Sequence, residues 1–322
     1  MLKNYDGSRF YDPNYPMPRN TASNNIIFGL FWYFKYRAQG TWPKKIPLKL
    51  LDNPPKKILG KDLRLTNVGH ATFLIQTLGL NILTDPVWSE RVSPFKFMGP
   101  KRVVEPGIKF EDLPHIDIIL ISHNHYDHLD IDTLKRLWDT FQPRIITPLG
   151  NDLVIKRHIS SAKIETYNWG ENTSHKNIKI YIEPMQHWSA RGFFDMNKAL
   201  WGAFTIETNY GNIYFVGDSG YGSGKYFKEA RKKFKKFRLA LLPIGAYKLK
   251  GLTEYSHMNP EEMVMTHIDL NSKYTVPSHY DVFKLAGESY GEAIEELNLA
   301  KARFNIKEGI HVVKIGTSCF IP

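Results

Sequence analysis

A cluster of metal-binding side chains within six residues constrains this chain more than any other feature of its sequence. The stretch reads His-Asn-His-Tyr-Asp-His and runs from His123 to His128. It directly follows an apolar run, residues 116–122, that predicts a buried strand. Neutral imidazole and carboxylate are the ligands that zinc and related divalent metals take in proteins. One metal cannot bind all four groups and keep a position open for substrate, so the spacing indicates a site for two metals.

Three further apolar runs each end on a side chain that can bind a metal. Each such residue alone is more often a hydrogen-bonded loop or turn residue, but strand ends on one edge of a sandwich converge on a single cleft. The expected ligands are His123, His125 and His187 for one metal, Asp127, His128 and His279 for the second, and Asp218 as a bridge between the two. Two metals held this close would share a hydroxide that attacks the substrate. Asp127 and Asp218 are therefore expected to be catalytic groups as well as ligands.

Short apolar runs, most of them rich in β-branched or aromatic residues, recur after residue 60 and predict strands. The predicted strands are residues 63–68, 72–76, 81–83, 116–122, 144–147, 163–167, 178–184, 203–207, 212–216, 239–243, 273–277 and 311–315. Helical patterns lie at residues 131–140, 153–158, 225–237, 260–269 and 288–300. Clusters of strands followed by helices predict an α/β fold in which helices cover two packed sheets, an αββα sandwich.

No change in composition marks a boundary between folded domains. Residues 61–322 are therefore expected to form a single catalytic domain. Residues 1–60 are rich in Pro, Asn and Lys and predict an irregular N-terminal arm. This arm is a candidate for contacting a membrane or a second subunit.

The composition limits the partners and the location. The 322 residues carry a net charge of +11, which favours anionic partners such as phosphates, nucleic acid or an anionic membrane surface. The single cysteine, Cys319, excludes an intramolecular disulfide and a cysteine-based zinc site. The first 20 residues are polar and show no secretory signal, and the longest apolar run, residues 26–34, is too short to span a bilayer. We therefore expect a cytoplasmic protein, either free or peripheral on a membrane.

Two segments are candidates for the membrane contact. Residues 26–34 either dip into a membrane interface or pack on the domain as an aromatic arm. Residues 225–238 carry Phe227, Phe234 and Phe237 at helical spacing, which predicts an amphipathic helix with its aromatic side on the core. The lysines of this helix either stay in water or contact anionic lipid. The sequence leaves both pairs of alternatives open.

The order of the ligands resembles the metallo-β-lactamase superfamily, in which a His-x-His-x-Asp-His motif precedes a histidine, an aspartate and a histidine. Flanking stretches resemble one branch of it, the N-acyl-phosphatidylethanolamine-hydrolysing phospholipases D and their bacterial relatives. These stretches are residues 68–72 (Val-Gly-His-Ala-Thr), 83–86 (Leu-Thr-Asp-Pro), 98–102 (Met-Gly-Pro-Lys-Arg), 121–130, 186–188 (Gln-His-Trp) and 243–247 (Pro-Ile-Gly-Ala-Tyr). The resemblance implies a metallo-β-lactamase fold, two zinc ions, cleavage of a phosphodiester in an N-acylated phospholipid and a homodimer.

Four residues outside the ligand set are candidates for supporting the chemistry. Asp85 follows a strand and is expected to accept a hydrogen bond from the far nitrogen of a metal-bound histidine, with a turn cap as the alternative. His70 is a second candidate for such support. His257 precedes a helix start, where it would hold the phosphate or protonate the leaving oxygen; a surface loop histidine is the alternative. Tyr280 stands where the family commonly has tryptophan, so it changes the rim of the site and bears on the substrate.

These observations favour a dinuclear zinc hydrolase, with manganese or iron as alternative metals. The leading hypothesis is a phospholipase D-type phosphodiesterase that cleaves N-acyl-phosphatidylethanolamine to an N-acylethanolamine and phosphatidic acid. A small-molecule hydrolase of the same fold, such as a lactonase, is the alternative. A nuclease ranks third, because no nucleic-acid-binding module is visible in the chain. The complete ligand set disfavours a binding protein without catalytic activity.

Overall fold

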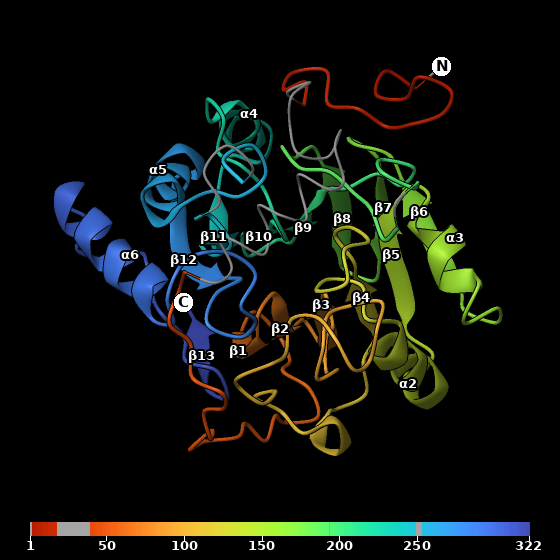
Figure 1. Cartoon of the computed structure of the whole chain (residues 1–322), viewed down its shortest axis with the longest axis horizontal. Coiled ribbons are helices and arrows are strands. Elements are labelled where there is room, and N and C mark those ends of the chain that lie inside the picture. Colours follow the sequence, from red (N-terminus) through yellow and green to blue (C-terminus); the bar gives the residue numbers. More distant parts are fainter. Residues whose placement is uncertain (1, 18–38, 193, 249–252) are drawn as a thin grey trace.

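The computed structural model describes residues 2–17, 39–192, 194–248 and 253–322, and the strands in these ranges form two sheets (Figure 1). The first sheet has the order β13-β1-β2-β3-β4-β5-β6, with the bounds β1 Leu63–Gly69, β2 Thr72–Thr77, β3 Leu80–Thr84, β4 Ile118–Leu120, β5 Arg144–Pro148, β6 Ile164–Tyr167 and β13 Ser318–Ile321. The second sheet has the order β12-β11-β10-β9-β8-β7, with the bounds β7 Asn172–His175, β8 Ile178–Glu183, β9 Ala203–Glu207, β10 Asn212–Phe215, β11 Phe237–Pro243 and β12 Ser272–Ser278.

Helices cover the outer faces of both sheets. Beside the first sheet lie α2 (Ile131–Phe141), α3 (Asn151–Lys156) and the short 3-10 helix η2 (Phe110–Asp112). Beside the second sheet lie α4 (Lys225–Phe234), α5 (Pro260–Leu270) and α6 (Glu292–Arg303). Figure 1 shows the two groups of helices on opposite sides of the strands. The predicted αββα sandwich is therefore confirmed.

One apolar layer joins the two sheets into a single domain. Phe73 and Leu65 of the first sheet pack in the same buried cluster as Phe215 and Leu241 of the second. Most of these strands are buried at every position, because one face of each sheet packs on the other sheet and the other face on helices. Two further clusters lie between each sheet and its own helices.

Strand direction brings the predicted ligands to one end of the sandwich. β10, β11 and β12 are parallel, and β8 runs in the same direction as β10 because both are antiparallel to β9. In the first sheet β3, β4 and β5 are parallel. His187, Asp218 and His279 follow the carboxyl ends of β8, β10 and β12, and the histidine cluster follows β4. Carboxyl ends of parallel strands share an edge, which is where sites form in sheets of this kind.

The sequence-based assignments differ from the structure in a few places. The strand predicted at residues 311–315 is wrong: Ile310 forms only a single bridge to Thr275, and the last strand is β13. β7 was not predicted because its residues are polar and half-exposed, as on an edge strand. The helix predicted over residues 225–237 ends at Phe234, and Phe237 begins β11, where its side chain is buried.

The described parts of the N-terminal arm, residues 2–17 and 39–60, contain no helix or regular strand but are bound to the core. Asp12 accepts a hydrogen bond from the Tyr226 hydroxyl on α4, and Asp52 forms an ion pair of 2.5 Å with Arg64 on β1. Residues 26–34 lie outside the described residues. Across the described ranges, no helix is both long enough and apolar enough to cross a bilayer. The division at residue 60 stays a prediction.

Candidate metal centre

The histidine cluster lies on a tight loop, residues 123–130, which we call the metal loop. It begins three residues after β4 and turns back at His125, whose carbonyl oxygen accepts hydrogen bonds from the backbone N–H of His128 (3.1 Å) and Leu129 (2.8 Å). Asp130 then caps α2 by accepting a hydrogen bond from the backbone N–H of Thr133. The strand and the capped helix fix both ends of the loop, so its side chains point to one place.

One set of nitrogen atoms converges around His125. Its Nδ1 lies 2.8 Å from Nε2 of His123 and 3.3 Å from Nε2 of His187. Oδ2 of Asp218 lies 3.9 Å from the Nε2 atoms of both histidines, and the four ligand atoms lie within 4.8 Å of one another. Ligand atoms of a tetrahedral zinc site with Zn–N of about 2.0 Å are about 3.3 Å apart. The spacing of this set matches that geometry.

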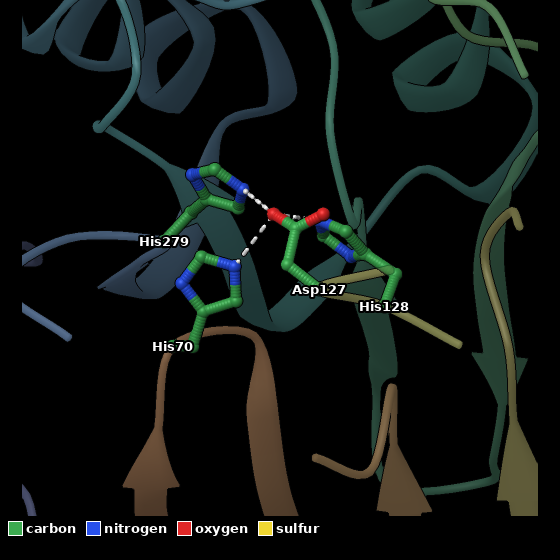
Figure 2. Close-up of side chains that lie close together, drawn as sticks. All are labelled: His70, Asp127, His128 and His279. Carbon is green, nitrogen blue, oxygen red and sulfur yellow. Dashed lines mark hydrogen bonds and ion pairs between the residues drawn. The ribbon is translucent and has the colours of Figure 1, made fainter. Parts of the chain in front are cut away.

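A second set surrounds Oδ2 of Asp127 (Figure 2). This oxygen lies 3.2 Å from Nε2 of His279, 3.5 Å from Nε2 of His128 and 3.0 Å from Nε2 of His70. Oδ2 of Asp218 is also 3.0 Å from Nε2 of His128 and 3.2 Å from Nε2 of His279. Asp218 therefore lies between the two sets, as a bridging ligand must.

Buried polar atoms without hydrogen-bond partners gather at this point. They include both carboxylate oxygens of Asp218, Nε2 of His128 and Nδ1 of His257. Unpaired polar atoms in a protein interior are costly and rare, so their concentration here calls for a cation. The donors are imidazole nitrogens and carboxylate oxygens, the set that zinc, manganese or iron accepts. The residues present therefore fit divalent metals.

In the protein without a bound metal, the histidines of the two ligand sets differ in protonation. Burial and the neighbouring imidazoles hold the pKa of His123 well below its usual range, so this ring is neutral and ready to bind a metal. Burial also opposes charge on His128 and His279, but the Asp218 and Asp127 carboxylates outweigh it, and the pKa of His279 rises to about 9. A metal entering the second set therefore has to displace protons.

Asp85 and Ser122 support the ligands from behind. Oδ2 of Asp85 lies 2.7 Å from Nδ1 of His128 and accepts a hydrogen bond of 2.6 Å from the Ser122 hydroxyl. The Ser122 hydroxyl also lies 2.9 Å from Nδ1 of His123. The backbone N–H of Ser122 donates a hydrogen bond of 2.7 Å to Oδ1 of Asp85. Hydrogen bonds of this kind fix the ring orientation of metal-binding histidines. Sequence reasoning identified Asp85 but not Ser122, although Ser122 directly precedes His123.

Two further supports were missed by sequence reasoning. The carbonyl oxygen of Ser256 lies 2.9 Å from Nδ1 of His187. The Arg191 guanidinium donates hydrogen bonds to the carbonyl oxygens of Asn124 (3.0 Å) and Leu129 (2.7 Å), so it spans the metal loop. It also stacks on the ring of Tyr126 at 3.9 Å. No local sequence signal marks Arg191 for this position.

The remaining candidates differ in how they contact the centre. His70 contacts the ligand Asp127 through its Nε2, and the centroid of its ring lies 4.0 Å from that of the His279 ring. Nδ1 of His257 lies 3.8 Å from Oδ2 of Asp218, with 13% of its side chain exposed, so this histidine faces the centre and solvent together. Tyr280 differs, because it packs against the core between the second sheet and its helices. A contact between Tyr280 and substrate stays a prediction.

The fold and this pair of ligand sets define a metal-dependent hydrolase of the metallo-β-lactamase type. The family model described as a β-lactamase superfamily domain matches residues 80–280. The chain belongs to the β-lactamase superfamily.

Two relatives share one named activity. The chain is 34% identical over 302 residues to N-acyl-phosphatidylethanolamine-hydrolyzing phospholipase D 1 of Caenorhabditis elegans, a match that covers 87% of this chain and 84% of the relative. It is 33% identical to the mitochondrial N-acyl-phosphatidylethanolamine-hydrolyzing phospholipase D of Saccharomyces cerevisiae, over 75% of this chain and 53% of the yeast protein. The sequence resemblance to this branch is therefore confirmed.

A solved structure shows the same fold in a more distant protein. An isothiocyanate hydrolase from Delia radicum gut bacteria superposes with a TM-score of 0.63 at 21% identity, covering 80% of this chain and 98% of that one. At this identity the likeness concerns the fold alone, because proteins that share one fold act on unrelated substrates.

Proposed function

We propose that this protein is a phospholipase D-type phosphodiesterase that hydrolyses N-acyl-phosphatidylethanolamine to phosphatidic acid and an N-acylethanolamine. The observation that carries the proposal is the position of Asp218, with one carboxylate oxygen within 3.9 Å of histidines from both ligand sets. The relatives that bear this activity by name supply the substrate class.

Two divalent metals, zinc in the first instance, would be held by the two sets. His123, His125 and His187 would bind one, Asp127, His128 and His279 the other, and Asp218 both. When bound, such a metal pair supplies a water of lowered pKa and positive charge beside the phosphate. Asp85, Ser122 and the Ser256 carbonyl hold the far nitrogens of His128, His123 and His187, which fixes the orientation of these three rings.

His70 would keep Asp127 in place. Its Nε2 lies 3.0 Å from Oδ2 of Asp127, and its ring is wedged between His279 and the edge of Phe283. Its carbonyl oxygen accepts a hydrogen bond of 3.0 Å from the backbone N–H of His279. One residue therefore links two ligands of the second set, which come from opposite sheets.

His257 is the group best placed to act on the substrate itself. It precedes α5, where Asn259 and Glu262 form a capping box, and its own backbone N–H is bound by the carbonyl of Thr253. The ring faces Asp218 from the solvent side, where it would hold a phosphate oxygen or protonate the leaving oxygen.

Replacing this residue tests the role directly. His257→Ala should keep two metals per chain and lower turnover by roughly 10²-fold or more, the usual size of an acid–base contribution. His257→Gln, which keeps a hydrogen-bond donor, should recover part of the loss if the ring positions the phosphate. Unchanged turnover in His257→Ala would exclude both roles.

The decisive experiment is the hydrolysis of a synthetic N-acyl-phosphatidylethanolamine by the purified protein, with Asp127→Asn as the control that removes a metal ligand. We expect phosphatidic acid from the wild type and none from the variant. If the metal-loaded wild type releases no phosphatidic acid, the proposed substrate is wrong. Hydrolysis of a lactone panel under the same conditions would then favour a small-molecule hydrolase.

A further inference from the structure

The two most exposed large apolar side chains in the described part of the chain lie at the metal end of the sandwich. Phe194 is 81% exposed and Phe97 is 79% exposed. Phe95 and Met98, beside Phe97, are each about half exposed. Single apolar side chains scattered over a surface need no explanation. Here, however, both segments that carry them are attached to the metal loop.

The first segment is a projecting hairpin. Arg91 pairs with Lys101 in an antiparallel bridge, the backbone N–H of Val92 donates to the carbonyl of Pro100 (3.1 Å), and that of Arg102 to the carbonyl of Glu90 (2.7 Å). These bonds close the hairpin at its base and leave residues 93–99 as its tip, with Phe95, Phe97 and Met98 uncovered. We call this segment the first tip.

The first tip is joined to the element that follows the metal loop. Nζ of Lys96 lies 2.7 Å from Oδ2 of Asp132, in the first turn of α2. At the base of the hairpin, the backbone N–H of Ser89 donates a hydrogen bond of 2.9 Å to Asp130, the last residue of the metal loop. The tip therefore projects from the metal end of the first sheet.

The second segment follows β8 of the second sheet, and its described part consists of residues 189–192 and 194–197. The backbone N–H of Asn197 donates to the carbonyl of Ser189 at 2.7 Å and closes it. Within the loop, Arg191 donates to two carbonyl oxygens of the metal loop. Just before it, the ring of Trp188 lies 4.4 Å from that of His125. Phe194, on the outer part of this loop, is the second tip.

We propose that the two tips insert into the interface of a phospholipid bilayer and hold the open side of the metal centre against it. Aromatic and methionine side chains with an intervening lysine suit the boundary between headgroups and acyl chains. The centre opens at this end, since Asp127 and His257 keep 14% and 13% exposure of their side chains and His125 is partly exposed, while the other ligands are almost fully buried. The choice of a bilayer as occupant rests on the proposed function, because a phospholipid substrate resides in one.

The basic helix proposed from the sequence has a different position. α4 ends at Phe234, and the two cations that follow it, Lys235 and Lys236, lead into the start of β11. The ligands follow the opposite ends of the neighbouring strands, so this end of α4 lies far from the metal centre. A membrane bound there would not face the site.

Vesicle binding without hydrolysis tests the inference. We would measure flotation of the metal-loaded full chain with vesicles of phosphatidylcholine and a minor fraction of phosphatidylglycerol, which contain no N-acylated lipid. Phe97→Asp combined with Phe194→Asp should weaken partitioning by at least about ten-fold, because two apolar anchors are replaced by charges. The matched control is Phe320→Asp: Phe320 is 61% exposed on β13 and lines a separate surface hollow at the other end of the sandwich.

The position of each tip can be read independently of affinity. Phe97→Trp and Phe194→Trp should each add fluorescence that brominated lipids quench, whereas Phe320→Trp should add fluorescence that they do not. Metal content and thermal unfolding of the aspartate variants, both expected at wild-type values, exclude misfolding as the cause of lost binding. If wild type does not bind vesicles, or the double variant binds as wild type does, the inference is overturned. It is equally overturned if the double variant converts a dimer into monomers, since the tips would then contact a second copy.

The failure of this inference can be told from the failure of the proposed function. A wild type that binds vesicles through its tips but releases no phosphatidic acid refutes the substrate and supports the surface. A wild type that hydrolyses N-acyl-phosphatidylethanolamine while the double variant still binds refutes the surface alone.

Discussion

Asp85→Asn should weaken metal binding although Asp85 is not a ligand. The carboxylate is fully buried and accepts three hydrogen bonds, from the backbone N–H of Ser122, from its hydroxyl and from Nδ1 of His128. Burial raises the pKa of Asp85, while the bonds from His128 and Ser122 act to lower it. An amide of the same shape has only one acceptor oxygen for these three donors. At least one donor therefore loses its partner and faces an NH₂ group instead.

The size of the effect follows from these contacts. Removing a partner that orients a metal-binding histidine typically costs 10- to 100-fold in metal affinity, or about 1.4–2.7 kcal/mol. The loss should fall on the second ligand set, because His128 belongs to it, and should spread to the first set through Ser122 and His123. We therefore expect the second metal to be released first.

Competition with a chromophoric chelator measures both affinities, and elemental analysis gives the number of metals per chain. The matched control is Asp117→Asn, which alters another largely buried carboxylate just before β4, where it accepts a hydrogen bond of 2.9 Å from the backbone N–H of Asn81. This control should lose some stability but bind both metals as wild type does. If Asp85→Asn also binds both metals within about two-fold of wild type, the supporting role assigned to Asp85 is wrong.

Three further predictions concern the scaffold. Gly217→Ala places a Cβ atom 2.4 Å from the Ser122 hydroxyl at a φ of +68°, so we expect a loss of about 2–5 kcal/mol in unfolding free energy. The control Gly170→Ala, at a φ of +83° with open space around it, measures the cost of the backbone conformation alone. Equal losses for the two variants in chemical denaturation would contradict the clash with Ser122. Burial lowers the pKa of His267 to about 4, so as pH falls the unfolded chain takes up a proton on this histidine before the folded chain does. About 2–3 kcal/mol of unfolding free energy should therefore be lost between pH 6.5 and 4. His267→Gln should reduce the dependence of unfolding free energy on pH in this range, and an unchanged dependence would refute the assignment. Arg191→Ala removes two hydrogen bonds to the metal loop and should speed metal release to a chelator several-fold. Arg191→Lys should lie in between, because an ammonium can donate to the same carbonyls but does not stack on Tyr126 as the planar guanidinium does; release at the wild-type rate would show that the loop is held by other contacts.

Much of the fold was readable because sheet and helix patterns are local. Runs of buried β-branched residues gave the long central strands, and the capping signal at Asn259 gave the start of α5, where the structure has a full capping box. The errors fall where local pattern and tertiary environment disagree. β7 is polar because it lies at a sheet edge. Residues 311–315 read as a strand in the sequence but form none in the structure, and of them only Val313 is buried.

By itself, the sequence determined the chemistry of the centre: which side chains can bind metal, their order along the chain, and the family they belong to. Ligand identity is a property of the side chain, and four metal-binding groups in six residues keep their meaning in any fold. Only the tertiary structure decided how these groups are held and what surrounds them. Arg191 meets the metal loop across 62 residues of sequence, and His70 meets His279 from the opposite sheet. The exposure of Phe97 and Phe194 likewise depends on which segments pack around them. The order of residues does not reveal this, because burial is set by contacts between segments that are distant in the sequence.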